Sequence, residues 1–518
     1  MKISADVCVV GTGGGGLAAA VKAAELGAGK VVVLEKMKRI GGSTVRPRGM
    51  FAVNSPLQER HGRFYNPDEF YREIMFMLCW DVDAKLVRKW VTGTGETIRW
   101  LESEGAVFNR LTRVAGREPD MWLVHHMIAD ERGDICTGRK IVDTLTKRCG
   151  ELGIDIYKST PARHLKTDEN GRVIGVIAEG PDGEVEVEAK AVILATGSIS
   201  ANKDLIASFY DGSHAYDDVM TMANFPSNTG DGLIMAEEIG GKRGCVSPLF
   251  IGPNNHYPGH GAISGKITRR CDLLQVNYCG ERYVDENLCR ADNYGWMMAQ
   301  CLDHQPDKRV YLLVDQNMIA HMKRDYGIAG LFDTTHPVNV DARGRWSAEV
   351  EETARKEIWP EDDDWRDQIE ESLDTEVANG HALKTDSLDE IAAYIGCSAK
   401  TLKKTVSDFN YYCRTGYDRE FVRDPASLVP FSKPPYYVMI GDTAVDTFIG
   451  GLLVDNHQHV MSVKDRPIPG LYAAGVMTSG WLHKSYAFPG SELSYTLFSG
   501  LNAAVEAVES LKEQEEEA

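Results

Sequence analysis

The sequence of 518 residues lacks the cysteine spacings that hold metals and iron–sulfur clusters. Its 11 cysteines are scattered, no CxxC or CxxCH pattern occurs, and only Cys271, Cys279 and Cys289 come near to a cluster. These absences argue against haem c attachment, iron–sulfur ligation and structural zinc, so we expect no metal site. Single buried thiols in a reducing compartment are the expected state.

Basic charge and long apolar runs are also scarce. The formal net charge is −19, which argues against nucleic acid as a partner because phosphate contacts need a basic surface. No apolar run reaches the roughly 18 residues of a membrane span, and the first five residues show no signal-peptide pattern. We therefore expect a cytoplasmic protein that does not associate with membranes.

What the chain does have is a glycine-rich turn near its start. An apolar stretch, residues 6–10, runs into Gly11-Thr12-Gly13-Gly14-Gly15-Gly16 and an alanine-rich segment, and a second apolar run ends at Glu35. This order predicts strand, turn, helix and strand, the unit that binds dinucleotides. Gly11 permits the tight turn, Gly13 lets the backbone approach a pyrophosphate, and Gly16 lets helix and strand pack closely. Glu35 would accept hydrogen bonds from a ribose.

Further elements follow from apolar periodicity. Residues 68–104 have helical character, and residues 140–152 predict another helix. A hairpin is expected over 172–190 around Gly180-Pro181-Asp182-Gly183, followed by a buried strand that ends at Ala195-Thr196-Gly197. Near the end of the chain, residues 497–511 predict a final helix.

The strand–helix alternation is lost in the middle of the chain, where acidic clusters and aromatic residues gather. We therefore predict an α/β dinucleotide-binding domain made of residues 1–239 and 425–518, interrupted by an inserted α+β domain, residues 240–424. Within the insertion, Ser387 is expected to cap a helix, and residues 399–415 predict another. A domain split in this way leaves a cleft between two lobes, where ligands often bind.

Five segments in this order resemble the flavoprotein family of fumarate reductase and 3-ketosteroid dehydrogenase, over nearly the whole chain. They are the opening turn with Glu35, Gly41-Gly42-Ser43-Thr44, Ala195-Thr196-Gly197, Thr229-Gly230-Asp231-Gly232 and Gly470-Leu471-Tyr472-Ala473-Ala474-Gly475. The resemblance implies extended FAD in a Rossmann-like domain and a mobile capping domain that carries the substrate. Covalent members have a histidine after the double glycine, whereas this chain has Ser43-Thr44, so non-covalent FAD is implied. Val476 stands where fumarate reductases usually keep a glutamate.

The resemblance implies FAD contacts along these segments and at positions near them. The residues are Gly11, Gly13, Gly14, Gly15, Gly16, Glu35, Lys36, Gly41, Gly42, Ser43, Thr44, Gly49, Met50, Ala162, Ala195, Thr196, Gly197, Asn228, Thr229, Asp231, Gly475, Ser491, Glu492 and Leu493.

Arg290 resembles the arginine that donates a proton in fumarate reductases. It lies four residues after Gly280-Glu281-Arg282-Tyr283-Val284-Asp285-Glu286, a segment that resembles the family pattern Gly-x-Arg-Phe-x-x-Glu followed by Arg, with Tyr283 in place of the Phe. A guanidinium needs burial and a carboxylate relay for this role, because its pKa lies far above neutrality. The alternative is a structural ion pair between Arg290 and Glu286.

Fumarate itself is a poor candidate substrate. Thr447 and Phe488 stand about where the family's histidine and second arginine bind the dicarboxylate. The segment from Tyr486 to Gly490 instead resembles the Tyr-x-x-Pro-Gly segment of 3-ketosteroid dehydrogenases. There the tyrosine hydroxyl and the glycine N–H polarise a ketone, an arrangement that would stabilise an enolate. The alternative is a simple turn in which Tyr486 only packs, with its hydroxyl on a backbone carbonyl.

A cation at position 290 favours protonating a carbanion, so the hypothesis is reduction of an activated C=C bond in an apolar ring substrate with a carbonyl group, such as a steroid or polyphenol. Hydride would come from flavin N5 and the proton from Arg290. One alternative is a 3-ketosteroid dehydrogenase that introduces a ring double bond; another is a flavin-bearing electron-transfer subunit. No second nucleotide motif is evident, so a partner protein could exchange electrons with the flavin. His125 and His126 are weaker candidates for the site.

Overall fold

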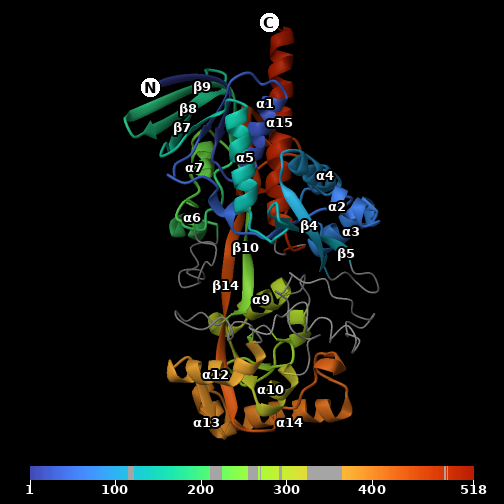
Figure 1. Cartoon of the computed structure of the whole chain (residues 1–518). Coiled ribbons are helices and arrows are strands. Elements are labelled where there is room, and N and C mark those ends of the chain that lie inside the picture. Colours follow the sequence, from blue (N-terminus) through green and yellow to red (C-terminus); the bar gives the residue numbers. More distant parts are fainter. Residues whose placement is uncertain are drawn as a thin grey trace. The chain divides into compact units, whose positions relative to one another are not determined.

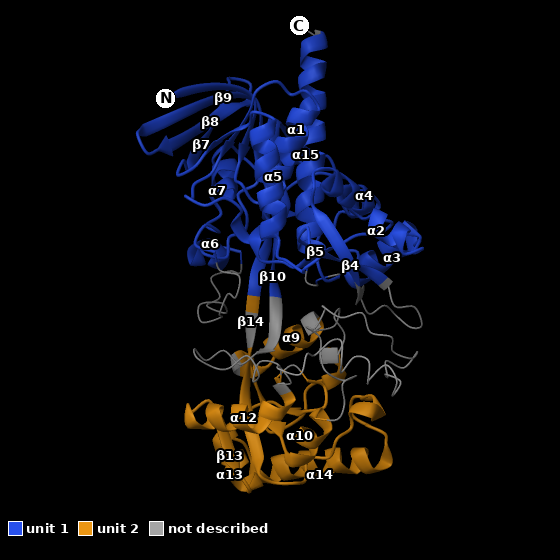
Figure 2. Cartoon of the chain, viewed as in Figure 1, with its two compact units in different colours: residues 1–112, 123–249, 446–518 blue, residues 113–122, 250–445 orange. Residues whose placement is uncertain are grey.

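The computed structural model describes residues 1–114, 122–209, 225–254, 267–268, 270–290, 295–323, 365–483, 486 and 488–517 (Figure 1). The chain forms two compact units (Figure 2). Unit 1 contains residues 1–112, 123–249 and 446–518, and unit 2 contains residues 113–122 and 250–445. The boundaries between the long segments of the two units lie at 249/250 and 445/446, whereas the sequence predicts boundaries at 239/240 and 424/425. Both fall inside long strands, β10 (Arg243–Asn254) and β14 (Tyr436–Leu453), whose continuation the sequence pattern does not reveal.

Unit 1 is built on an eight-stranded sheet with the path β15-β16-β9-β1-β2-β6, extended by β7 and β8 beside β9. Its strands are β1 (Lys2–Val10), β2 (Val31–Leu34), β6 (Asp155–Tyr157), β7 (Ala162–Thr167), β8 (Val173–Gly180), β9 (Gly183–Leu194), β15 (His459–Met461) and β16 (Pro467–Ala473). The five strands from β16 to β6 are parallel. All four residues of β2 are buried, as expected for a strand covered on both faces.

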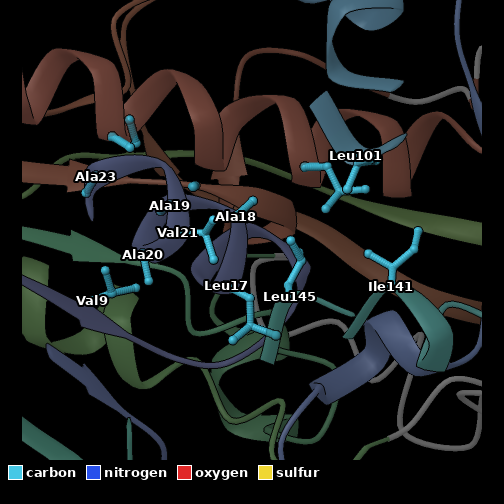
Figure 3. Close-up of a cluster of buried hydrophobic side chains, with 14 of the residues drawn as sticks. Val9, Leu17, Ala18, Ala19, Ala20, Val21, Ala23, Leu101, Ile141 and Leu145 are labelled. Carbon is cyan, nitrogen blue, oxygen red and sulfur yellow. The ribbon is translucent and has the colours of Figure 1, made fainter. Parts of the chain in front are cut away.

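Three helices of unit 1 share one hydrophobic core with the sheet. Helix α1 (Gly14–Glu25) packs against α5 (Arg139–Glu151) and α15 (Ser491–Glu517). The buried face of α1 is almost all alanine and glycine, so the neighbouring helix comes very close: a Cβ on Gly500 would lie 2.2 Å from the carbonyl oxygen of Gly15. Figure 3 shows this cluster, in which Leu17 and Val21 meet Leu145 of α5.

The predicted hairpin and helices are confirmed, with three corrections. The hairpin turns at Pro181-Asp182, and β9 continues without a break to Leu194. The expected helix over 68–104 is two helices, α3 (Pro67–Met77) and α4 (Ala84–Ser103), because Cys79 and Trp80 adopt positive φ angles and Asp83 caps α4. The final helix is also longer than predicted.

A small three-stranded sheet has the order β3-β5-β4, with β3 (Gly49–Phe51), β5 (Trp122–Ala129) and β4 (Val107–Val114), most of whose residues belong to unit 1. The pairing of β3 with β5 sets Phe51 opposite His125 and Met50 opposite His126. The sheet therefore places both histidines beside a strand that carries predicted FAD contacts.

Unit 2 contains an antiparallel set of strands and its own hydrophobic core. Strand β14 pairs with β12 (Arg309–Val314) and β13 (Ala382–Thr385), and β12 pairs with β11 (Leu274–Val276). The helices that contribute to this core include α10 (Gln316–Met322), α12 (Ile369–Ala378), α13 (Leu388–Ile395) and α14 (Ala399–Thr415). The predicted Ser387 cap is confirmed, since its Oγ accepts a 3.4 Å hydrogen bond from the N–H of Glu390. None of the helices in the described ranges has the length and apolar composition needed to cross a bilayer.

Candidate functional site

Four parallel strands of unit 1 end at the same level. Val10 at the end of β1 is paired with Leu34 of β2 and Leu194 of β9, and Leu194 is paired with Ala473 of β16. The residues that follow these ends, among them Gly11 and Glu35, therefore meet at one edge of the sheet. The carboxyl edge of a parallel sheet is where such folds bind ligands.

A pocket of about 970 Å³, part of it open to solvent, lies at this edge. It is lined by Val10, Gly11, Thr12, Gly13, Gly14, Gly15, Leu34, Glu35, Lys36, Met37, Gly42, Ser43, Thr44, Pro47, Thr160, Ala162, Ala195, Thr196, Gly197, Ser227, Asn228, Asp231, Ala474, Gly475, Val476, Glu492, Leu493 and Thr496. We call it the nucleotide pocket. It collects segments that lie far apart in the sequence of unit 1.

The glycines of the opening turn have different physical roles. A Cβ on Gly11, whose φ is +109°, would lie 2.3 Å from the carbonyl oxygen of Ala195, and one on Gly16 would lie 2.0 Å from that of Gly11. These two glycines allow backbones to pack. A Cβ on Gly13 would meet only the Thr44 hydroxyl oxygen, at 3.9 Å, so this glycine leaves open space at the start of α1. That space suits the close approach of a pyrophosphate to a helix N-terminus.

Glu35 is buried and already hydrogen-bonded. Its Oε2 accepts from the Thr12 N–H at 3.1 Å and from the Thr12 hydroxyl, and its Oε1 accepts a 2.7 Å bond from the N–H of Met37. Each carboxylate oxygen has two lone pairs, so a ribose hydroxyl could still donate to Glu35. The chain itself holds the orientation of the carboxylate.

Three hydrogen bonds tie residues 228–231 to Lys36 and Ser43 at the pocket. The Lys36 ammonium donates to the Thr229 hydroxyl at 2.6 Å and to Asp231 at 2.8 Å. The Asn228 amide donates to the Ser43 hydroxyl at 3.1 Å. These bonds bring predicted FAD-binding residues together from two distant parts of the sequence.

Tyr486 lies buried just before α15. Its hydroxyl oxygen accepts a 3.1 Å hydrogen bond from the backbone N–H of Glu492. Burial raises the pKa of Tyr486, and the charges of Glu492 and Asp446 add to the rise; the N–H groups of Glu492 and Gly490 oppose it. The hydroxyl therefore stays protonated at neutral pH.

Gly490 sits against strand β3. Its φ is +79°, a Cβ there would lie 2.6 Å from the Cα of Met50, and its carbonyl oxygen accepts from the N–H groups of Phe51 and Ser494 at 3.1 and 3.0 Å. Only glycine fits this position. Gly490 thus fixes the start of α15 against β3.

His125 and His126 are buried in unit 1 beside these residues. The His125 ring lies against Gly49 and Gly490, since Cβ atoms placed there would be 2.6 and 2.8 Å from it. Burial lowers the pKa of His125 to about 4 and that of His126 to about 3. The His126 Nε2 also lies 2.5 Å from the Ser55 hydroxyl oxygen. Both rings are neutral at physiological pH, which favours a structural role for His126.

The side chain of Arg290 lies outside the described residues; its backbone closes a short helix, Glu286–Arg290. Within unit 2, Glu286 is fully buried and paired with two other arginines, Arg282 at 2.6 Å and Arg423 at 3.2 Å. Arg282 also pairs with Asp418 at 2.9 Å. The segment that resembles the family's proton-donor region therefore contains a buried ionic network.

Six of the residues expected to contact FAD do not line the nucleotide pocket: Gly16, Gly41, Gly49, Met50, Thr229 and Ser491. Thr229 contacts two residues that do, since its hydroxyl accepts from Lys36 and donates to Asp231 at 2.6 Å. The Ser491 hydroxyl accepts a 3.2 Å bond from the N–H of Phe488, which does not line the pocket. Other residues that line the pocket were not predicted from the sequence. Thr12 lies inside the glycine motif and Thr496 one helical turn after Glu492, so both had a signal, whereas Pro47 and Thr160 had none.

Comparison with known proteins identifies the family of this chain. The FAD binding domain family matches residues 6–493. The chain belongs to this family. Vinyl phenol reductase from Lactiplantibacillus plantarum is 26% identical over 525 residues, which cover 99% of this chain and 98% of that protein. A probable fumarate reductase from Shewanella frigidimarina is 27% identical over 97% of this chain and 75% of its own length.

Among solved structures, 3-ketosteroid-Δ4-(5α)-dehydrogenase from Rhodococcus jostii in complex with 4-androstene-3,17-dione shares the fold. Its TM-score is 0.72 at 21% identity, and the match covers 98% of this chain and 97% of that one. The mixed α/β fold is therefore that of the family, and the chain is an FAD-dependent oxidoreductase. The residues present fit the cofactor: the open space at Gly13 suits the pyrophosphate, and Glu35 and Lys36 line the same pocket.

Proposed function

We propose that this protein reduces an activated C=C bond in an apolar ring substrate that carries a carbonyl group, such as a steroid or polyphenol. The observation that carries the proposal is the buried Tyr486 hydroxyl, which accepts a backbone hydrogen bond at the start of the helix whose Glu492 and Leu493 line the nucleotide pocket. A protonated hydroxyl held in this way is suited to polarise a carbonyl next to the cofactor.

When bound and reduced, FAD supplies a hydride for the β-carbon of the substrate. Tyr486 donates a hydrogen bond to the carbonyl oxygen and so stabilises the enolate charge that develops there. The N–H groups of Gly490 and Glu492 lie against the tyrosine oxygen and support this charge. Arg290 then gives a proton to the α-carbon, a role assigned from its place in the sequence, and unit 2 acts as the capping domain that carries it.

The names of the relatives support a reduction. The vinyl phenol reductase is similar to this chain over almost its full length, and a urocanate reductase from Eggerthella lenta is 27% identical over 91% of this chain. Non-covalent FAD is part of the proposal, because Ser43 and Thr44, which line the pocket, stand where covalent members of the family carry a histidine. The electrons that reduce FAD would come from a partner protein or a small donor.

The test is anaerobic reoxidation of the photoreduced protein by a panel of dicarboxylates, steroid enones, polyphenols and vinyl phenols. We expect the flavin absorbance to return fastest with an apolar unsaturated ring compound, and more slowly in Arg290→Ala. Reoxidation by fumarate alone would contradict the proposed substrate class, and a wild-type rate in Arg290→Ala would contradict the proton-donor assignment.

The second candidate function is a dehydrogenase that introduces a ring double bond, which the shared fold with the steroid dehydrogenase favours. Oxidised protein mixed with a saturated 3-ketone separates the two, because only a dehydrogenase would bleach its flavin. A third candidate, an electron-transfer subunit without a substrate of its own, predicts no response to any of these compounds.

A further inference from the structure

Glu492 is the acidic residue of the nucleotide pocket whose carboxyl group has no hydrogen-bond or ion-pair partner among the described residues. It is half-buried in the first turn of α15. Glu35 and Asp231, the other acids that line the pocket, both have partners. A desolvated carboxylate without a partner is costly, so Glu492 needs either a proton or a ligand that donates to it.

The charges around Glu492 favour the protonated form. Burial raises the pKa of Glu492 to about 8, and the Asp446 carboxylate on β14 adds to the rise. The opposing groups are the Arg46 guanidinium, which follows the turn of residues 42–45, and the N-terminus of α15 itself. Tyr486, another titratable neighbour among the described residues, is neutral. The net effect is a carboxylic acid that can donate a hydrogen bond.

FAD bound in the nucleotide pocket would be a partner for the Glu492 carboxyl group. FAD carries a negatively charged pyrophosphate and a ring system rich in hydrogen-bond acceptors, so an ionised Glu492 in the same pocket would be repelled while a neutral one would be a donor. We propose that Glu492 contacts bound FAD as a neutral acid and that loss of its proton weakens retention of the cofactor. If Tyr486 binds the substrate carbonyl as proposed above, the contact between Glu492 and FAD would lie near the substrate. This placement rests on the proposed function.

The experiment follows cofactor retention without any substrate. Holoprotein is diluted at pH 7, 8 and 9, filtered, and the released FAD is measured by fluorescence, with circular dichroism recording the fold at each pH. If only the neutral acid binds FAD well, the apparent affinity falls with the neutral fraction, about tenfold between pH 7 and pH 9. Glu492→Gln keeps a neutral side chain and should hold FAD equally at all three pH values.

Glu509→Gln is the matched control, because Glu509 is exposed on the same helix. It should lose FAD at pH 9 as the wild type does. Equal retention by the wild type at pH 7 and pH 9, or an unchanged pH dependence in Glu492→Gln, would overturn the proposal. If Glu492→Gln does not accumulate as holoprotein, the visible spectrum of FAD bound to the wild-type protein is recorded from pH 6.5 to 9. One spectral transition near pH 8 supports the proposal, and a spectrum that stays constant over this range overturns it. Neither result depends on turnover, so failure of the proposed function would be seen separately.

Discussion

The hydroxyl oxygen of Tyr486 and the backbone N–H of Glu492 are joined by a hydrogen bond of 3.1 Å. This bond links the side chain proposed to hold the substrate carbonyl with the helix turn that lines the nucleotide pocket. Because the N–H belongs to the backbone, substitution of the Glu492 side chain leaves this bond in place. The roles of the two residues can therefore be tested separately.

Removing the Tyr486 hydroxyl should slow chemistry and spare the cofactor. We expect Tyr486→Phe to reduce the rate of flavin reoxidation by substrate about 100-fold, the usual cost of losing an oxyanion donor, with FAD content unchanged. Tyr495→Phe is the control, since this buried tyrosine bonds Thr478 and does not line the pocket. Equal rates in the two variants would assign Tyr486 to packing.

A methyl group at Gly13 should block FAD and leave the fold intact. Gly13 has an ordinary φ of −65°, and its Cβ would meet only the Thr44 hydroxyl, so the apoprotein should unfold at the wild-type temperature. The methyl group would occupy the space assigned to the pyrophosphate. Overpacking of about 1–3 kcal/mol corresponds to an affinity loss of roughly 5- to 150-fold.

The control for this change is Gly150→Ala, in α5, where a Cβ meets nothing within 4 Å. It should keep FAD and gain up to about 1 kcal/mol of stability from helix propensity. Titration of each apoprotein with FAD, followed by fluorescence, measures the difference. Tight binding by Gly13→Ala would contradict the position given to the pyrophosphate.

Alanine at Gly490 should destabilise unit 1 itself. The added Cβ would collide with the backbone of β3 at 2.6 Å while φ stays positive. We expect a loss of about 3 kcal/mol or more in the free energy of unfolding, compared with about 1 kcal/mol for Gly62→Ala, which has a positive φ but open space. Thermal unfolding of the two variants side by side tests the expectation; equal shifts would mean that β3 gives way easily.

The buried histidines should make the protein sensitive to acid. Burial lowers the pKa of His125 from 6.5 to about 4. Between these two pH values, His125 therefore binds a proton in the unfolded chain but not in the folded one. Its contribution to stability is present above pH 6.5 and is lost as the pH falls toward 4. Between pH 7 and pH 5 the loss is about 2 kcal/mol from this residue.

Urea unfolding at the two pH values measures this loss. His125→Gln should show a correspondingly smaller difference between pH 7 and pH 5, and His61→Gln, at an exposed site, should behave like the wild type. An unchanged difference in His125→Gln would show that acid acts elsewhere in the chain.

The nucleotide pocket was largely predictable because its residues follow strand ends. Gly11, Glu35 and Ala195 each come directly after a short apolar run, and parallel strands bring such positions together. The break between α3 and α4 was not predictable from apolar spacing, since Cys79 and Trp80 are ordinary residues in a left-handed conformation that tertiary packing sets. The hydrogen-bond partners of Lys36 and Asn228 could not be predicted from the sequence either, because they lie almost 200 positions away.

The hydrogen bonds from Thr12 and Met37 to Glu35 have a consequence for how the cofactor enters. The acid is already immobilised by its own chain, so no rotamer freedom has to be given up when a ribose arrives, a saving of about 0.5–1.5 kcal/mol for such a side chain. A protein stripped of FAD would thus keep the recognition end of its pocket in shape. Apoprotein made by mild removal of the flavin should reload quickly, at a rate set by diffusion into the pocket and not by rearrangement of Glu35.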